Sequence, residues 1–406
     1  MANSALEYFA DSMGNVVLKD ANGNPSIFVR HPQQKSIEFD ASLPDHVHPA
    51  FIVNNVTDPA LLIGKYMASE LTSNGTQYSL PNMPPRVSME YDTFRQKMNA
   101  FGGDVTGLTI ADHGLLVLIA HKKGITATHG NNNYGADYRA GTRYTLGEAV
   151  TANAKRIHRG WEWTCKKNHT TSSDLLPENA PDYWEKGKQV GGTPVKTQFS
   201  SDNAYSGYNT LTGSGPIDWN FLDDPCLEAD IQGNATEQVY GFRLVNCEIQ
   251  IIPDNNAADP ECNDGASSSV WKAIKPHAND DGYDLVAPGT EGTVHYTWQN
   301  SKITLDTVAP NFDSEYRNTP FKNVAVNTTN MPYVPTILYE LGLCPLPGTT
   351  VDGTLYVQMT AEERVARRGG VCSHTSYAGV ASLYCFSPRS SSYVFYGARP
   401  RSRQKA

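Results

Sequence analysis

The stretch from residue 364 to residue 406 constrains this chain more than any other segment. Arginine, glycine and proline recur there as a frame, and the positions between them are mostly serine and tyrosine, with histidine, phenylalanine and cysteine. A buried strand would be rich in valine, isoleucine and leucine, and a disordered tail would lack aromatic residues. Tyrosine gives a large contact area at low entropic cost, and serine gives adaptable hydrogen bonds. The pattern is typical of a binding loop held on a rigid scaffold.

The composition favours a folded β or α+β protein rich in loops. The chain has 406 residues, of which 39% are hydrophobic, so it can bury a sizeable core. Only 18% are charged, whereas 33 glycines, 25 prolines and 21 tyrosines are present. The net charge of -9 argues against general nucleic-acid binding, which needs a basic face. We expect the basic residues from 399 to 405 to be solvated or docked on acidic neighbours.

The sequence predicts a protein without a membrane span, a secretion signal or a disulfide framework. No apolar run reaches the roughly 20 residues that a bilayer requires. The first residues lack the basic and apolar regions of a signal peptide. Its 7 cysteines are scattered and form no CxxC pair.

Local patterns predict a few regular elements. Residues 1–45 contain short strand-like pieces and a turn, which indicate an N-terminal arm or attachment segment. Residues 46–406 are predicted to form one large domain. Apolar residues at helical spacing before a Gly-Gly pair predict a helix near residues 89–103, and a second helix follows before Gly124. Alternating apolar residues predict a hairpin near residues 240–251.

Five separated motifs occur in an order that resembles the variable proteins of diversity-generating retroelements. They are HPAFIV with IGKY and SLPNMPP, GNNNYG, TLTGSGP, GFRLVNCEIQIIPDNN, and RRGG with TSYAGV, PRS and GARP. The resemblance covers about residues 46 to 402. It implies a C-type-lectin-like α+β fold of the formylglycine-generating-enzyme type, with a small antiparallel sheet, two helices and long ordered loops.

The resemblance also implies a function and a site. In that family a retroelement rewrites adenine-containing codons in a C-terminal variable region, here residues 364–402, and the products bind a macromolecular ligand, such as a phage receptor. The partner would be a protein or a glycan on a cell surface, and an oligomer is compatible with this interpretation. The location stays open, and a virion (a phage tail) or a bacterial cell is compatible with the resemblance. Tyrosines and phenylalanines would be the energetic anchors. The expected ligand-binding residues are Val371, Cys372, Ser373, His374, Tyr377, Tyr384, Phe386, Ser387, Ser391, Tyr393, Val394 and Phe395.

Two other functions are alternatives. Formylglycine-generating enzymes bind copper through two thiolates around a string like the one from His374 to Tyr377, but Ser373 and Ala378 stand at the flanking positions here. We therefore expect no enzyme, no catalytic residue and no cofactor. A structural virion component would explain the arm, but not the composition of residues 364–402.

The metal content stays open. Acidic pairs in predicted loops, such as Asp280–Asp281, have ligands that calcium prefers, and His46 with His48 forms an HxH pair that suits zinc. Solvated loops are the alternative interpretation of the acidic pairs, and the HxH pair lacks nearby cysteine or acidic ligands beyond Asp45.

Overall fold

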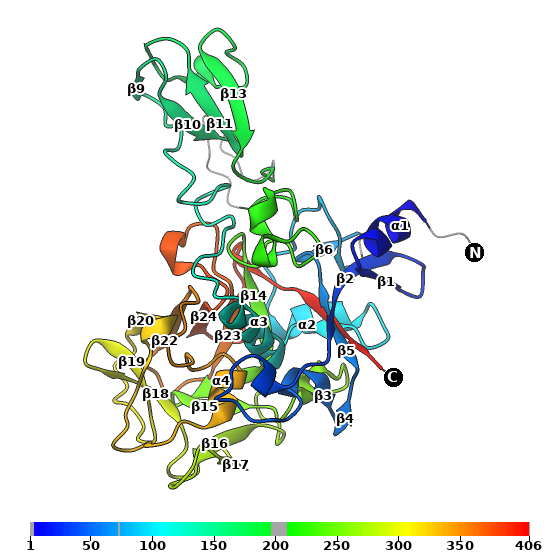
Figure 1. Ribbon diagram of the computed structural model, residues 1–406, viewed down its shortest axis with the longest axis vertical. Helices are drawn as coiled ribbons and strands as arrows, with labels where there is room; N and C mark the ends of the chain where they lie inside the picture. The colour runs from blue at the N-terminus through cyan, green and yellow to red at the C-terminus, as the bar shows by residue number, and fades with distance from the viewer. Residues whose placement is uncertain (1–3, 72–73, 196–208, 406) are drawn as a thin grey trace.

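A computed structural model describes residues 4–71, 74–195 and 209–405 of the chain (Figure 1). Strands make up 32% and helices 15% of the structure. Two large sheets with the helices form a body, and a small β module projects from one end of it (Figure 1). Within these described ranges, no helix is long and apolar enough to cross a bilayer.

The largest sheet has 12 strands and mixes parallel with antiparallel pairs. Along its main path lie β20 (Tyr316–Pro320), β22 (Thr354–Gln358), β24 (Leu383–Ser387), β23 (Arg364–Arg368), β14 (Thr236–Val245), β15 (Glu248–Ile251), β18 (His295–Gln299), β19 (Lys302–Asp306) and β21 (Ala325–Val326). Three further strands join its sides, namely β16 (Lys272–Pro276) on β15, β17 (Tyr283–Val286) on β16, and β25 (Tyr396–Gly397) on β14. The C-terminal stretch thus supplies β23, β24 and β25 to one region of this sheet.

The described residues contain four α-helices, of which two cover the sheet near its centre. They are α1 (Ala5–Ser12), α2 (Tyr91–Asn99), α3 (Ile110–Lys122) and α4 (Thr336–Glu340). The predicted helix near residues 89–103 is confirmed as α2, and all four large apolar side chains of its predicted face are buried. The predicted second helix is confirmed as α3, which packs on β14 and α4. Thr109 and Asp112 form its capping box, which fixes where the helix begins.

Side chains on β14, β23 and β24 alternate between the two faces of the large sheet, as the pleat of a strand requires. Ala366, Leu383 and Cys385 join the main hydrophobic core, to which α3 and α4 also contribute. Arg367 and Tyr384 are cross-strand neighbours on the opposite face. One face of these strands therefore builds the main core. The other face packs Tyr240 and Val365 against α2 and presents Arg367 and Tyr384 to a pocket.

The predicted hairpin near residues 240–251 is confirmed as β14 and β15. The two residues of its turn, Asn246 and Cys247, have φ angles of 54° and 57°. Positive φ at both central residues is the geometry that matches the twist of a two-residue hairpin.

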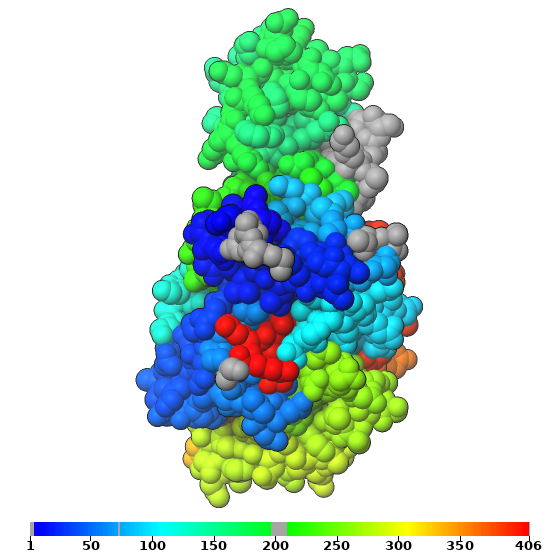
Figure 2. All heavy atoms as spheres, turned by 90° about the vertical axis from the view of Figure 1, so that its right-hand side faces the viewer, coloured from blue at the N-terminus to red at the C-terminus, as the bar shows by residue number. Residues whose placement is uncertain are grey.

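A 5-stranded sheet joins both ends of the chain. Its order is β1 (Val16–Lys19), β2 (Pro25–Pro32), β5 (Ala60–Gly64), β26 (Pro400–Gln404) and β8 (Thr106–Gly107). Residues of the predicted N-terminal arm thus pair with β5, and the C-terminal strand lies between β5 and β8, where it reaches the surface (Figure 2). Arg403 pairs with Asp58 and Lys405 with Asp104, so this part of the basic tail is docked on acidic neighbours.

The projecting β module has a small core of its own. It contains β9 (Ala149–Val150), β10 (Lys155–His158), β11 (Trp161–Cys165), β12 (His169–Thr170) and β13 (Trp184–Gln189), in a 3-stranded and a 2-stranded sheet (Figure 1). Tyr144, Trp163 and Trp184 pack together inside it, in a cluster separate from the main core. The remaining short pairs are β3 (Ile52–Val53) with β4 (Val56–Thr57), and β6 (Ala68–Glu70) with β7 (Gln77–Ser79).

The expected fold class is wrong. A C-type-lectin-like α+β fold with a small antiparallel sheet, two helices and long ordered loops does not describe a 12-stranded mixed sheet with several smaller sheets. Many of the strands are only two to five residues long, too short to display a period-2 pattern. Six strands, β16 to β21, lie within residues 272–326, where the local patterns predicted no strand. The pairs that assemble the sheet join segments far apart in sequence, which local patterns do not record.

Candidate ligand-binding site

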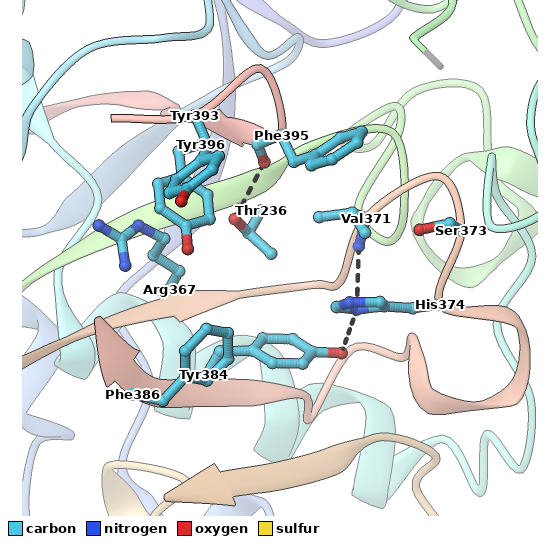
Figure 3. A pocket seen from close by; sticks show the side chains of 10 residues that line it. All are labelled: Thr236, Arg367, Val371, Ser373, His374, Tyr384, Phe386, Tyr393, Phe395 and Tyr396. Atoms are coloured by element: carbon cyan, nitrogen blue, oxygen red, sulfur yellow. Dashed lines mark hydrogen bonds between the residues drawn. The ribbon is translucent and has the colours of Figure 1, made fainter. Parts of the chain in front are cut away.

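A pocket of about 290 Å³ lies where the three C-terminal strands meet (Figure 3). It is enclosed by one face of the large sheet, by the loop that follows β23, and by the loop between β24 and β25. Its lining residues are Thr236, Arg367, Val371, Ser373, His374, Tyr384, Phe386, Tyr393, Phe395 and Tyr396. The pocket is therefore built almost entirely by the stretch that the sequence singled out.

The strands supply the floor of the pocket. Thr236 of β14, Arg367 of β23, and Tyr384 and Phe386 of β24 occupy the face opposite the main core. The Tyr384 ring stacks on Tyr356 of β22 with the ring centroids 4.9 Å apart. Tyr384 is only 1% exposed, so it is a floor residue and not a free surface side chain.

The loop between β24 and β25 forms the opposite wall. The carbonyl of Phe395 accepts hydrogen bonds from the Thr236 amide at 2.9 Å and from the Thr236 hydroxyl at 3.1 Å. The rings of Tyr393 and Tyr396 contact each other with centroids 5.3 Å apart. These contacts hold the loop on β14 and leave Tyr393 60% exposed at the mouth of the pocket.

The loop after β23 closes the third side. The Val371 amide donates to Nδ1 of His374 at 3.3 Å, and the Tyr384 hydroxyl lies 3.0 Å from the same nitrogen (Figure 3). The Tyr384 hydroxyl donates its one proton to the Tyr377 carbonyl at 3.0 Å. Because the Val371 amide donates to Nδ1, we assign the ring proton to Nε2. Burial lowers the pKa of His374 to about 4, so the ring is neutral at physiological pH.

Three arginines of the C-terminal stretch are buried in ion pairs away from the pocket. Arg368 and Arg399 bind the two carboxylate oxygens of Glu237, at 2.8 Å and 2.6 Å, and Arg401 pairs with Asp112 at 3.1 Å. Arg399 also donates to four backbone carbonyls. Each of these charges is fully desolvated and paired, which makes the frame costly to change.

Two glycines of the frame are required by the backbone. Gly369 and Gly370 have φ angles of +85° and +92°, a region that side chains rarely adopt. A Cβ at Gly370 would lie 2.7 Å from the Cβ of Ala378. The loop that carries Val371 to Tyr377 therefore begins at a turn that only glycine fits.

The structure brings seven of the twelve predicted site residues to the pocket and leaves five outside its lining. The seven are Val371, Ser373, His374, Tyr384, Phe386, Tyr393 and Phe395. Tyr377 and Val394 are exposed nearby, and Ser391 is half-buried. Cys372 and Ser387 are buried, and the Ser387 hydroxyl bonds the Tyr396 hydroxyl at 2.8 Å. Burial raises the pKa of the Cys372 thiol to about 12, which keeps it protonated.

Three pocket residues were not expected at the site. Thr236 and Tyr396 lie outside the predicted set, and Arg367 was assigned to the frame. Tyr356 and the exposed Tyr316 extend the aromatic floor, since their rings contact Phe386. Strand alternation was the available signal, because Arg367 and Arg368 are adjacent on β23 and must point to opposite faces.

The residues considered for metals have other partners. Nε2 of His46 lies 2.5 Å from the Glu340 carboxylate, and Nε2 of His48 lies 3.0 Å from the Glu340 carbonyl. The HxH pair thus fastens the chain around residues 46–48 to α4. In the parts of the chain that the structure describes, no group of three or more histidine, cysteine or acidic side chains is arranged to hold a metal ion.

No known protein-family model matches this chain, and no curated protein matches it.

Proposed function

We propose that this protein binds a macromolecular ligand through the pocket and its rim, in the manner of the variable proteins of diversity-generating retroelements. The observation that carries the proposal is the division within residues 364–402. Seven of the twelve predicted positions line one pocket, whereas Arg368 and Arg399 are buried in ion pairs behind it. A binding surface whose residues vary needs two parts. One is a fixed, buried framework that holds the backbone, and the other is a set of side chains that point from this framework toward the ligand.

The rim supplies the area that a macromolecular contact requires. A stable protein–protein interface buries roughly 800 Å² on each partner, which is more than a pocket of this size offers. We define the rim as the exposed residues next to the lining, namely Tyr393 of the lining itself, its neighbour Val394, Tyr377 of the loop after β23, and Tyr316, whose ring contacts Phe386. Tyrosine is enriched among the residues that dominate binding energy, because it combines a large contact area with a hydrogen-bonding group. The pocket would receive one protruding group, and the rim would supply the surrounding contact.

The gene's surroundings test this proposal. We expect a neighbouring reverse-transcriptase gene and a near-copy of the 3′ end of the coding sequence, differing from it at adenines. The differing codons should include those of the pocket and rim positions, such as Ser373, Tyr393 and Phe395, and should spare Arg368 and Arg399. A genome that lacks both the reverse transcriptase and the near-copy would contradict the proposal.

A further inference from the structure

Arg367 differs from the neighbouring arginines because it is buried without a charged partner. It is 1% exposed, and it forms no ion pair with any described residue. Its Nε and Nη2 atoms find no hydrogen-bond acceptor among the described residues. Arg368, the next residue, pairs with Glu237. Because Arg367 and Arg368 are consecutive residues of one strand, their side chains lie on opposite faces of the sheet, and this explains why only Arg368 reaches Glu237.

Aromatic rings and one amide surround the Arg367 guanidinium. It lies 3.8 Å from the centre of the Tyr396 ring, at one end of the pocket (Figure 3). Tyr384 is its cross-strand neighbour on β24, and Gln238 is its neighbour on β14. Both polar side-chain atoms of Gln238 are buried and likewise lack a hydrogen-bond partner in the described part of the chain. Arg367 of the pocket lining and its cross-strand neighbour Gln238 are therefore both unsatisfied in the described part of the chain.

None of the residues that the structure describes offers this arginine a carboxylate. Glu237, the nearest acidic residue on β14, points to the other face, where Arg368 and Arg399 use both of its oxygens. Burial lowers the pKa of Arg367 to about 10, so it is still charged at neutral pH. A buried charge without a partner is costly, and polar groups left unsatisfied in a native structure call for an explanation. At a ligand pocket, the simplest explanation is that the ligand supplies the partner.

We propose that Arg367 recognises a carboxylate on the ligand, supplied by a glutamate or aspartate side chain of a protein partner, with Gln238 beside it as a neutral donor. The guanidinium fork matches the two oxygens of a carboxylate, and desolvation by the surrounding rings strengthens the contact. This inference rests on the proposed ligand-binding function and adds the chemistry of the ligand.

The size and lining of the pocket favour an amino-acid side chain over an acidic glycan. Its volume of about 290 Å³ is at the lower end for ligand pockets and suits one protruding group. Val371, Phe386 and Phe395 give it walls of hydrocarbon, which suit the methylene groups of glutamate. A sugar ring would bring hydroxyl groups on all sides, each of which needs a hydrogen-bonding partner.

Small probes test the inference without knowledge of the natural ligand. Capped glutamate (N-acetyl-L-glutamate N-methylamide), the equivalent capped glutamine and N-acetylneuraminic acid would each be titrated into the full chain and followed by ligand-observed NMR and calorimetry. We expect capped glutamate to bind at least about tenfold more tightly than capped glutamine, because only the carboxylate forms charge-assisted hydrogen bonds. Equal binding of the two, or binding of N-acetylneuraminic acid alone, would overturn the assignment.

Two variants and a control complete the test. Arg367→Met should abolish the preference for capped glutamate, whereas Arg30→Met, at an exposed arginine of β2, should keep it. Arg367→Lys retains the charge without the fork and should bind more weakly than the native chain, so the test does not depend on the folding of the methionine variant. A preference that survives Arg367→Met contradicts the inference. Failure of these probes would leave the gene-neighbourhood test of the proposed function untouched, so the two can fail separately.

Discussion

At the scale of single residues, two adjacent arginines of β23 have opposite roles. Arg368 is fixed by Glu237 on the core side, whereas Arg367 lines the pocket and forms no ion pair with any described residue. The difference follows from strand pleating, which turns consecutive side chains to opposite faces. The same alternation separates Tyr384 and Phe386, which face the pocket, from Leu383 and Cys385, which face the core.

Replacement of the two arginines by methionine should therefore have unequal effects on stability. Arg368→Met removes one of the two cations of buried Glu237, and a loss of about 3 kcal/mol or more is expected for breaking a buried pair. Arg367→Met removes an unpaired buried charge and should change the free energy of unfolding by less than about 1 kcal/mol, or raise it. Urea unfolding measures both variants. Similar losses for the two would mean that Arg367 has a partner in the protein.

Replacement of the two tyrosines of the site by alanine should also have unequal effects on stability. Tyr384 is buried and stacked on Tyr356, so Tyr384→Ala should cost about 3–5 kcal/mol, as expected for loss of a large buried ring. Tyr393 is 60% exposed, and Tyr393→Ala should change stability by no more than about 0.5 kcal/mol. Thermal and urea unfolding test the contrast. A stable Tyr384→Ala variant would contradict the role of Tyr384 as the floor.

At the scale of elements, short segments dock on the body through specific polar contacts. His46 and Ser36, on the chain between β2 and β3, both bind the Glu340 carboxylate of α4. This hydrogen bond raises the pKa of His46. Burial alone would raise the pKa of Glu340, but hydrogen bonds from His46 and Ser36 hold it below its ordinary value. The contact is strongest where the histidine is protonated and the glutamate is ionised.

This contact predicts a pH dependence. A histidine whose pKa is raised on folding stabilises the folded state below its unfolded pKa, and the stabilisation is lost as the pH rises through the folded pKa. Native protein should thus exceed His46→Gln in melting temperature near pH 6 by more than near pH 9. The difference should be small, because His46 is about half exposed. A difference that is constant over this range would contradict the assignment.

The projecting module should unfold separately from the body. Its core is a cluster of its own, in which Trp184 is buried and donates to the Leu175 carbonyl. Trp184→Ala should increase hydrogen exchange in β10, β11 and β13 by orders of magnitude, because local openings depend on local contacts. Amides of β14 and β23 should keep their protection. Loss of protection in both regions would show that the module and the body unfold together.

At the scale of the whole molecule, the sequence predicts single helices and hairpins but not the pairing of strands that are distant in the chain. α2 was predictable because Tyr91, Phe94 and Met98 lie at helical spacing. The hairpin of β14 and β15 was predictable from its alternation. The parallel pairing of β22 with β24 and the insertion of β26 between β5 and β8 were not, since they join residues far apart in the chain. The expected fold class came from the resemblance of five motifs, which do not record these pairings, and the 12-stranded mixed sheet contradicts it.

The site was predictable where one continuous segment of the sequence forms it. Most of the pocket comes from residues 371–396, and composition alone indicated that stretch. Thr236 was not indicated, because it reaches the pocket only through the pairing of β14 with β25. The exposure of each side chain also depended on the sheet, as the burial of Tyr384 and Cys372 demonstrates.

The most direct test of the central claim is a display library of the full chain in which Ser373, Phe386, Ser391, Tyr393, Val394 and Phe395 are randomised together. Its members would be sorted for resistance to protease and then for binding to a panel of purified proteins, beside a matched library that randomises Arg368, Glu237, Gly369, Gly370, Arg399 and Arg401. The account predicts that most members of the first library stay folded and yield target-specific binders. Most members of the second library should fail to fold and be lost in the protease selection. A first library that is mostly unfolded, or folded but without binders, would contradict it.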